Sequence, residues 1–200
     1  MPGGQKYQSG DYTVETDASQ AAYFWAAAAI AKGSVLVRDI SLDTCQGDIV
    51  FAKLLASMGC EVVETETGVM VSCRGGLKPL DADLGQAPDI VPTLAVVAAY
   101  ATGTSVIRNV AHLQYKESNR IEAVINELAK LGIKARFDGQ DLYVAGGRPH
   151  GGSIQTYNDH RIAMSFAVAG LGTEGVVIND PQCVAKSFPG FWEVFDSLKP

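Results

Sequence analysis

The segment from Tyr157 to Gly170, YNDHRIAMSFAVAG, carries polar side chains at the start of an otherwise apolar stretch that is predicted to form a helix. Asp159 suits the N-cap of such a helix, because a carboxylate there accepts hydrogen bonds from free backbone N–H groups and meets the positive end of the helix dipole. Arg161 does not suit that place, since the same dipole disfavours a cation. An anion bound at the helix start would account for Arg161.

The segment YKESNR, Tyr115 to Arg120, places charges in a similar way at the start of a second predicted helix. Lys116 and Arg120 are four residues apart and would share one helix face, with Glu117 beside them. A solvated helix start with an ordinary Glu117–Arg120 ion pair is the structural alternative. Lys186, in CVAKSF, stands just before a third predicted helix and is again a cation at a helix start.

Cations at so many predicted helix starts indicate one anionic ligand with more than one phosphate or carboxylate group. Asp89 and Glu117 are carboxylates at the same positions, and they are candidates for proton transfer to and from that ligand. The chain has no P-loop and no G-x-G-x-x-G before a predicted helix, so a standard nucleotide cradle is excluded.

The composition limits the other classes of function. The 200 residues carry a net charge of -6, which argues against a general nucleic-acid binder because phosphate binding needs a basic surface. The longest apolar run, Ala21 to Ala31, is too short to cross a bilayer, and the first residues lack the apolar core of a signal peptide. Free buried thiols are expected rather than a zinc site, since no cysteines form a C-x-x-C pair (Cys45, Cys60, Cys73, Cys183). The expected setting is cytoplasmic.

A weak repeat runs along the chain. Asp17, Asp89 and Asp159 each precede an apolar stretch, at intervals of 72 and 70 residues, and each is a predicted N-cap. A β-rich run and a second, amphipathic helix follow each stretch. The first two units then end in a predicted β-hairpin, at residues 60–73 and 133–146.

The first helix of each unit is apolar almost all round, which is typical of a helix buried on every side. We therefore predict an α+β fold of the alpha-beta prism type, in which three βαβαββ repeats place helices inside and sheets outside. The predicted bounds of the repeats are 11–76, 77–147 and 148–200. The third repeat is incomplete because no hairpin follows its last helix, so its sheet should be two strands short with one unpaired edge.

Several of these strings together resemble the 5-enolpyruvylshikimate-3-phosphate synthases (3-phosphoshikimate 1-carboxyvinyltransferases). The likeness runs from about Gly10 to Leu198 and includes KESNRI, YNDHRIAMSFAVAG and DPQCVAKSFPGFWEVF. The YNDHR and K-E-S-x-R strings together are its specific part. The resemblance implies transfer of the enolpyruvyl group of phosphoenolpyruvate to the 5-hydroxyl of shikimate 3-phosphate, with release of phosphate. It further implies the shikimate pathway of chorismate and aromatic amino-acid biosynthesis, and a reaction without a metal or an organic cofactor.

The resemblance also implies roles for single residues. Asp89 would contact the shikimate hydroxyls and act as a base, and Glu117 would give a proton to C3 of phosphoenolpyruvate, for which we expect a raised pKa. Lys116 would bind the 3-phosphate of the shikimate substrate. The other expected contacts are cations for phosphoenolpyruvate (Arg120, Arg161, Lys186), side chains that line the site (His160, Asp17), and a sugar contact where the family often has Asn (His112).

Members of this family have two lobes built from the same triple repeat, and the sequence resembles one of them. Residues 1–10 would then be an interlobe linker remnant, and 11–200 a single enolpyruvyl-transferase lobe that is inactive without the other lobe. The alternatives are an anion-binding or scaffold lobe without catalysis, and a module like the RNA-phosphate cyclases, which share this architecture. Neither a nucleic acid nor a membrane is an expected partner.

Overall fold

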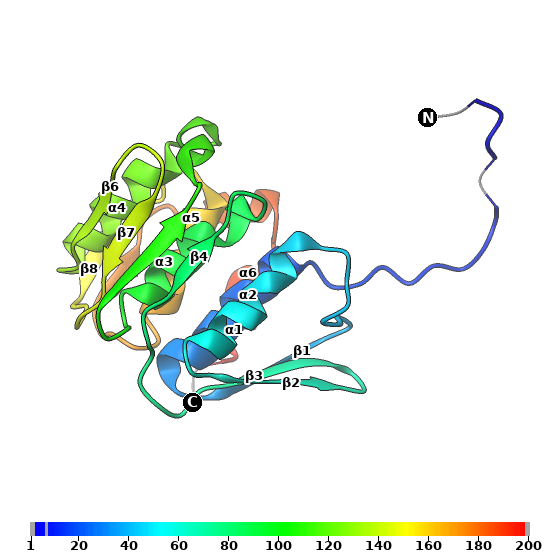
Figure 1. Ribbon diagram of the computed structural model, residues 1–200, viewed down its shortest axis with the longest axis horizontal. Helices are drawn as coiled ribbons and strands as arrows, with labels where there is room; N and C mark the ends of the chain where they lie inside the picture. The colour runs from blue at the N-terminus through cyan, green and yellow to red at the C-terminus, as the bar shows by residue number, and fades with distance from the viewer. Residues whose placement is uncertain (1–2, 7, 199–200) are drawn as a thin grey trace.

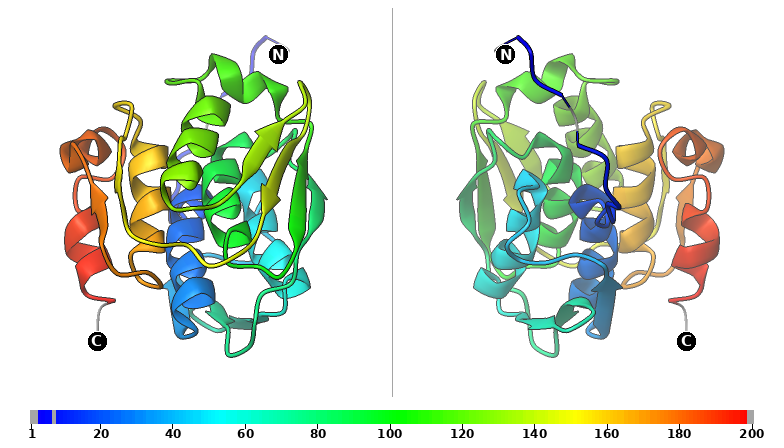
Figure 2. Two further views of the ribbon diagram at one scale, coloured as in Figure 1. Left: turned by 90° about the vertical axis from the view of Figure 1, so that its left-hand side faces the viewer. Right: turned by 90° about the vertical axis from the view of Figure 1, so that its right-hand side faces the viewer.

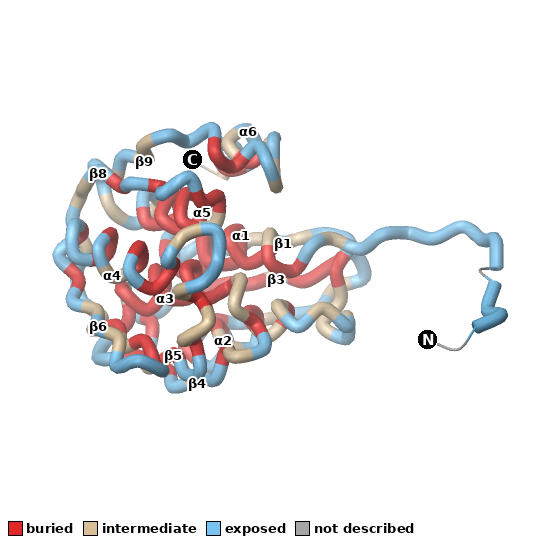
Figure 3. Tube along the Cα trace, turned by 90° about the horizontal axis from the view of Figure 1, so that it is seen from above, coloured by how far each residue is buried: buried red, intermediate tan, exposed pale blue. Residues whose placement is uncertain are grey.

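Three helices pack against one another at the centre of the molecule: α1 (Ala18–Ala31), α3 (Val91–Ala98) and α5 (His160–Ala169). The computed structural model describes residues 3–6 and 8–198, and Figures 1 and 2 show sheets and further helices outside this core. All eight residues of α3 and nine of the ten residues of α5 are buried. Figure 3 shows the buried colour concentrated in the helix core. Small and branched apolar side chains cover every face of these helices, so each face packs against protein. The predicted arrangement of buried helices is confirmed.

The first two repeats each build an outer sheet that includes a hairpin. The first sheet has the strand order β1-β3-β2, and all its pairs are antiparallel (β1 Ser34–Arg38, β2 Glu61–Thr65, β3 Gly68–Ser72). The second has the order β4-β5-β7-β6, with only β4 and β5 parallel (β4 Asp81–Asp83, β5 Thr104–Arg108, β6 Ala135–Phe137, β7 Leu142–Ala145). Both predicted hairpins, β2–β3 and β6–β7, are confirmed. Gly139, with a φ of 104°, adopts the left-handed conformation in the turn between β6 and β7.

The second helix of each repeat is α2 (Val50–Ser57), α4 (Arg120–Lys130) or α6 (Phe191–Asp196). These helices are amphipathic: on α4 the apolar side chains of Ile121 and Leu128 are buried, while the opposite face meets solvent. Short 3-10 turns precede the helices or link them to strands (η1 Gly47–Ile49, η2 Pro88–Ile90, η3 Ala111–Tyr115, η4 Pro181–Lys186). Among the described helices, none combines the length and the apolar character needed to cross a bilayer.

The third repeat ends without a hairpin in the part of the chain that the structure describes. Its sheet holds β8 (Gly152–Ile154) and β9 (Val176–Ile178), paired in parallel. A cavity of about 380 Å³ lies between α5, β9 and α6, and apolar side chains form most of its lining (Ala167, Leu171, Val176, Ile178, Trp192, Phe195). Within the described residues, this sheet has two strands fewer than that of the second repeat, as predicted, but only one fewer than that of the first repeat, which has three strands.

The first repeat lacks the strand that the βαβαββ pattern predicts before α1. Residues 8–16 lie in no helix or strand, and Tyr12 is 80% exposed. Thr16 joins the end of β1, where its N–H and hydroxyl groups donate to the carbonyls of Asp39 and Arg38 at 2.7 and 2.8 Å. The rest of the segment extends away from the body of the molecule (Figure 1).

Candidate active site

Asp159 is the centre of an ion-pair network at the starts of α4 and α5. Its side chain is 0% exposed and accepts a hydrogen bond from the N–H of Arg161 at 2.9 Å, which makes it the predicted N-cap of α5. Arg120 Nε donates to the same carboxylate at 2.8 Å, and the Ser118 hydroxyl donates at 3.0 Å. Burial alone would raise the pKa of Asp159, but Arg120 and these hydrogen bonds outweigh burial and lower that pKa below its ordinary value.

Arg120 joins this network to Asp89. The Arg120 side chain is 3% exposed, and its NH1 group donates to Asp89 Oδ1 at 3.0 Å. The other oxygen of Asp89 accepts from Arg161 NH2 at 2.8 Å. Charges therefore alternate along Asp159, Arg120, Asp89 and Arg161. The anion that the sequence requires near Arg161 is supplied in the structure by the protein's own Asp89.

The prediction that Asp89 is an N-cap is wrong. Asp89 lies in η2, and α3 begins after Ile90 without a side-chain capping bond. The Asp89 carboxylate instead binds two guanidinium groups, and such charge-assisted hydrogen bonds are stronger than bonds from neutral backbone N–H groups. Ion pairs with Arg120 of the same repeat and with Arg161 of the third repeat therefore replace the local capping role at this position.

Glu117 forms a second, more exposed cluster with His160 and Lys186. Glu117 Oε2 lies 2.8 Å from Lys186 Nζ and 3.2 Å from His160 Nδ1. Lys186 Nζ also donates to the carbonyl of Asn158 at 2.9 Å. Burial alone would raise the pKa of Glu117, but Lys186 and His160 together lower it below the ordinary value. The expectation of a raised pKa for Glu117 is therefore wrong for this arrangement of side chains.

His160 is the first residue of α5 and is buried between the two clusters. Burial lowers the pKa of His160, and the cations of Arg161 and Lys186 lower it further, against the opposing effect of Glu117. The imidazole is therefore neutral near pH 7. In the neutral ring, the tautomer protonated at Nδ1 donates to Glu117 and orients that carboxylate.

Two details of the predicted cation positions are wrong. Lys116 follows η3 and lies outside α4, whose N-cap is Asn119, so Lys116 and Arg120 do not share a helix face. Lys186 is the last residue of η4 and does not stand at the start of α6. The alternative Glu117–Arg120 ion pair is not formed either, because Arg120 turns inward to the two aspartates. Only Arg120 and Arg161, among the four cations, lie in the first turn of an α-helix.

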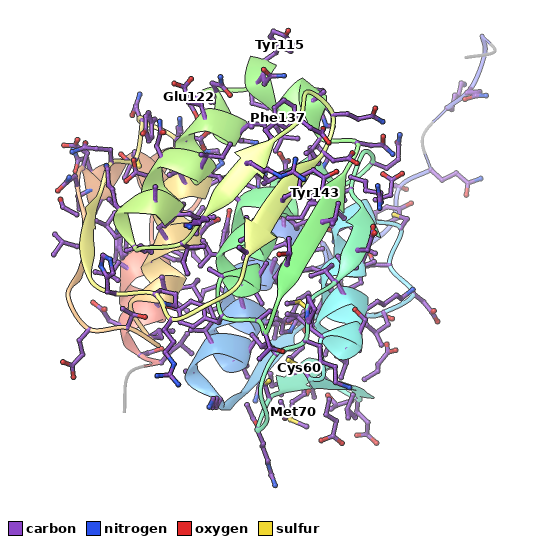
Figure 4. The ribbon with its side chains drawn as sticks, turned by 60° about the vertical axis from the view of Figure 1, so that its left-hand side comes forward. Cys60, Met70, Tyr115, Glu122, Phe137 and Tyr143 are labelled. Atoms are coloured by element: carbon purple, nitrogen blue, oxygen red, sulfur yellow. The ribbon has the colours of Figure 1, made fainter. Side chains whose placement is uncertain are left out.

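Lys116 and His112 flank the network on the η3 side. Lys116 is exposed, and no described carboxylate forms an ion pair with it, which leaves its ammonium group available for a ligand. His112 lies in η3, and its Nε2 atom is buried without a hydrogen-bond partner among the described residues. Figure 4 shows the neighbouring Tyr115 at the outer tip of this end of the molecule.

Asp17 reaches the site from the first repeat. It is the predicted N-cap of α1, where it accepts from the N–H groups of Ser19 and Gln20. Asp17, His160 and Arg161 line the same small cavity of about 40 Å³. The structure thus gathers side chains from all three repeats at one end of the helix core.

Tyr23 lines the same small cavity and was not singled out in the sequence. Its hydroxyl group is buried and has no hydrogen-bond partner among the described residues. Burial raises the pKa of Tyr23 to about 12, and nearby Arg161 opposes that rise. The sequence feature that could have indicated a role for Tyr23 is its hydroxyl group within a largely apolar helix, where a phenylalanine could fill the same space.

The charges of the site favour an anion over a metal ion. Glu117, Asp159 and His160 do offer ligand atoms within 4.8 Å of one another. However, the oxygen atoms of the two carboxylates already bind Lys186 and Arg120. Those cations oppose a divalent metal, whereas an anion can take the place of a carboxylate beside them.

Comparison with known proteins gives a consistent set of relatives. Residues 1–195 match the family model described as EPSP synthase (3-phosphoshikimate 1-carboxyvinyltransferase). The chain is 52% identical over 202 residues to the 3-phosphoshikimate 1-carboxyvinyltransferase of Syntrophobacter fumaroxidans, and the match covers 100% of this chain and 48% of that protein. The enzyme of the same name from Trichormus variabilis is 44% identical over 192 residues, which cover 96% and 45% of the two chains.

Solved structures agree with these relatives. An EPSP synthase structure from Acinetobacter baumannii superimposes with a TM-score of 0.83 at 30% identity, over 92% of this chain and 46% of that one. The enolpyruvyl transferase NikO from Streptomyces tendae has a TM-score of 0.70 at 21% identity and supports the fold alone. The chain spans about half the length of the curated relatives it matches. The resemblance stated from the sequence is confirmed.

Proposed function

Because the chain belongs to the EPSP synthase family, we propose that it supplies one part of an active site that transfers an enolpyruvyl group from phosphoenolpyruvate to shikimate 3-phosphate. The observation that carries this proposal is a pair of exchangeable ion pairs, Arg161–Asp89 at 2.8 Å and Lys186–Glu117 at 2.8 Å. In each pair, an anionic substrate can bind the cation in place of the carboxylate. The carboxylate is then free for proton transfer. The rest of the site would come from the remaining part of such an enzyme.

Arg120 is the fixed member of the cation set. Its guanidinium is buried against Asp159, which holds it in place before any substrate arrives. Arg161 shares Asp89 with it, and Lys186 belongs to the Glu117 cluster. Both would bind the phosphate and carboxylate groups of phosphoenolpyruvate. Negative charge develops on the phosphate as it leaves, and cations already in position stabilise that charge without reorganisation.

Asp89 and Glu117 would move the protons. When the substrate carboxylate or phosphate takes over Arg161, Asp89 loses a cation and can accept the proton of the 5-hydroxyl as its oxygen attacks C2 of phosphoenolpyruvate. When the substrate takes over Lys186, Glu117 loses the contact that lowers its pKa, so that pKa rises. A protonated Glu117 can then give its proton to C3. In the second step C3 returns a proton to a carboxylate while the C2–O bond to phosphate breaks.

The remaining site residues would act on binding. Lys116, exposed and outside the ion-pair network, is suited to the 3-phosphate of the shikimate substrate. His112 offers a buried ring nitrogen for a sugar hydroxyl, and neutral His160 orients Glu117. Asp17 closes the side of the site that faces α1. No step of this scheme uses a metal or an organic cofactor.

The same proposal includes the organisation and setting of the protein. Residues 11–200 would form one lobe, and residues 1–10 would belong to the connection with a second lobe that completes the site. This division is supported by the match to about half of each relative and by the exposed, extended course of residues 8–16. The reaction belongs to the shikimate pathway, and the cytoplasmic location expected from the sequence forms part of the proposal.

Calorimetric titration of the chain with each substrate tests the binding half of this proposal. Arg161→Ala should weaken phosphoenolpyruvate binding by roughly tenfold or more, the scale for losing a hydrogen bond to a charged group. Lys116→Ala should weaken shikimate 3-phosphate binding to a similar extent. Lys134→Ala is the matched control, since it removes an equally exposed lysine away from the site. If Lys116→Ala binds shikimate 3-phosphate as tightly as Lys134→Ala does, the substrate assignment is wrong.

A further inference from the structure

Glu127 is a fully buried carboxylate on α4, two helical turns beyond Arg120. Its Oε1 atom accepts a hydrogen bond from the hydroxyl group of Tyr157 at 2.7 Å, and its Oε2 atom accepts one from the N–H of Gln155 at 3.0 Å. Lys130 Nζ bonds both oxygens from the next turn of the helix, at 2.8 and 2.7 Å. The bonds that Glu127 accepts from outside α4 therefore come from the segment between β8 and α5.

That segment contains an unusual turn. Tyr157 and Asn158 have φ values of 54° and 53°, so two successive residues with side chains adopt the left-handed conformation. Such residues are strained relative to glycine and hold this conformation only when their surroundings fix it. The N–H of Asp159 closes the turn by donating to the carbonyl of Thr156 at 2.8 Å.

The turn places groups of the candidate site. The carbonyl of Asn158 points at Lys186 Nζ and accepts from it at 2.9 Å. The next residue, Asp159, caps α5 and binds Arg120, so it also sets the position of Arg161 on the first turn of that helix. One face of α4 thus fixes the segment twice, through Glu127 before the turn and through Arg120 after it.

We propose that Glu127 and Tyr157 are positioning residues, whose hydrogen bond holds the left-handed turn so that Lys186 and Arg161 can bind one anionic substrate together. The inference rests on the proposed function, in which these two cations bind phosphoenolpyruvate. Neither Glu127 nor Tyr157 needs to touch a substrate for this role. The competing interpretation is a buried Glu127–Lys130 pair that stabilises α4 and has no bearing on the site.

The variant Tyr157→Phe keeps the ring and removes only the hydroxyl group, which donates a hydrogen bond to Glu127. Tyr143→Phe is a matched control, because the hydroxyl of Tyr143 also donates to a carboxylate next to a turn, that of Asp138 at 2.9 Å. Tyr143 lies on β7 in the outer sheet of the second repeat (Figure 4), and its side-chain partners, Asp138 and Arg136, are not members of the site network. Each substitution therefore deletes one phenol–carboxylate bond at one turn.

Hydrogen exchange of backbone amides on the chain itself is the first measurement. In Tyr157→Phe the amides of Gln155 and Asp159 should exchange about tenfold faster, as expected for losing a hydrogen bond to a charged acceptor. The amides of Gln140 and Asp141, which bond to Asp138, should keep their native rates. Tyr143→Phe should give the reverse pattern.

Substrate binding is the second measurement, made on the same samples. Tyr157→Phe should raise the Kd for phosphoenolpyruvate about tenfold, while the Kd for shikimate 3-phosphate, assigned to Lys116 on the η3 side, stays at its native value. Tyr143→Phe should change neither Kd. Glu127→Gln, which keeps the shape of the side chain but removes its charge, should shift the Kd for phosphoenolpyruvate in the same direction and further.

The outcomes separate this inference from the function on which it rests. If the exchange rates at Gln155 and Asp159 do not change in Tyr157→Phe, the hydrogen bond does not hold the turn and the inference is overturned. If those amides exchange faster but phosphoenolpyruvate binds as tightly as to the native chain, Glu127 is structural only and the inference is overturned. If the native chain binds neither substrate, the proposed function is wrong, and the positioning role that depends on it is wrong as well.

Discussion

Asp17 and Asp159 occupy equivalent places in the first and third repeats, and both are N-caps of a buried helix. Asp17 is exposed, and it accepts from the backbone N–H groups of Ser19 and Gln20 on its own helix. Asp159 is fully buried, and it adds Arg120 from the second repeat to its capping bond. The capping bonds are local to one helix and recur in both repeats. The ion pair forms only at Asp159, because Arg120 of the second repeat packs beside it.

Asp89 occupies the equivalent place in the second repeat and differs most from the other two aspartates. It does not cap a helix, and its carboxylate bridges Arg120 and Arg161. The repeat therefore sets the position of each carboxylate, whereas the arginines that pack beside it decide its role. The candidate site lies where these partners differ from repeat to repeat.

The largest expected effect comes from deleting each capping carboxylate in turn. Asp159→Ala should lower the free energy of unfolding by about 3–5 kcal/mol, since it leaves the buried Arg120 guanidinium without its closest partner. Asp17→Ala should lower it by about 1 kcal/mol, the usual loss for an N-cap. Urea denaturation of the two variants measures both values. Equal losses would mean that the ion pair adds nothing to the cap and that the comparison fails.

Arg161→Ala should separate binding from stability. In the complete enzyme it should remove about 2–4 kcal/mol of transition-state stabilisation, seen as a fall in kcat/KM. The free energy of unfolding of the chain should change by only about 1 kcal/mol or less, because Asp89 keeps its second partner, Arg120. A loss of stability as large as that of Asp159→Ala would make Arg161 a structural residue.

The native chain and Asp159→Asn should differ less in their free energy of unfolding at acid pH than at neutral pH. The pKa of Asp159 is lowered by folding, so its contribution to stability is fully present above its unfolded pKa, near 3.9, and is lost as the pH falls through its folded pKa. The gap in the free energy of unfolding between the two proteins should therefore be largest near neutral pH and shrink below about pH 4. A gap that stays constant down to pH 2 would show that charge plays no part in the role of Asp159.

The smallest expected effects concern the titration of His160, followed by NMR. Lys186→Ala removes a cation and should raise the pKa of His160, whereas Glu117→Gln removes an anion and should lower it. Lys134→Ala, at an exposed position away from the site, should leave the titration unchanged. Shifts of the same sign in the first two variants would contradict the cluster described around Glu117.

The sequence was sufficient for features set by local chemistry. All-round apolar helices predicted a helix core, and residues 60–73 and 133–146 predicted hairpins, because these patterns have few other solutions. The site was predicted as a set of residues but not as a network. Whether Asp89 caps a helix or binds Arg120 and Arg161 depends on how α3, α4 and α5 pack against one another, which the periodicity of the sequence does not contain. The lowered pKa of Glu117 likewise depends on Lys186 arriving from another part of the chain.

The most direct test of the central claim is phosphate release from phosphoenolpyruvate and shikimate 3-phosphate. It would be measured for the chain alone and for a chimera in which the chain replaces the matching 48% of the Syntrophobacter fumaroxidans enzyme. We predict no turnover by the chain alone, turnover on the order of 10 per second by the chimera, and loss of that activity on Asp89→Asn. Turnover at that rate by the chain alone, or a folded chimera that releases no phosphate, would contradict the account.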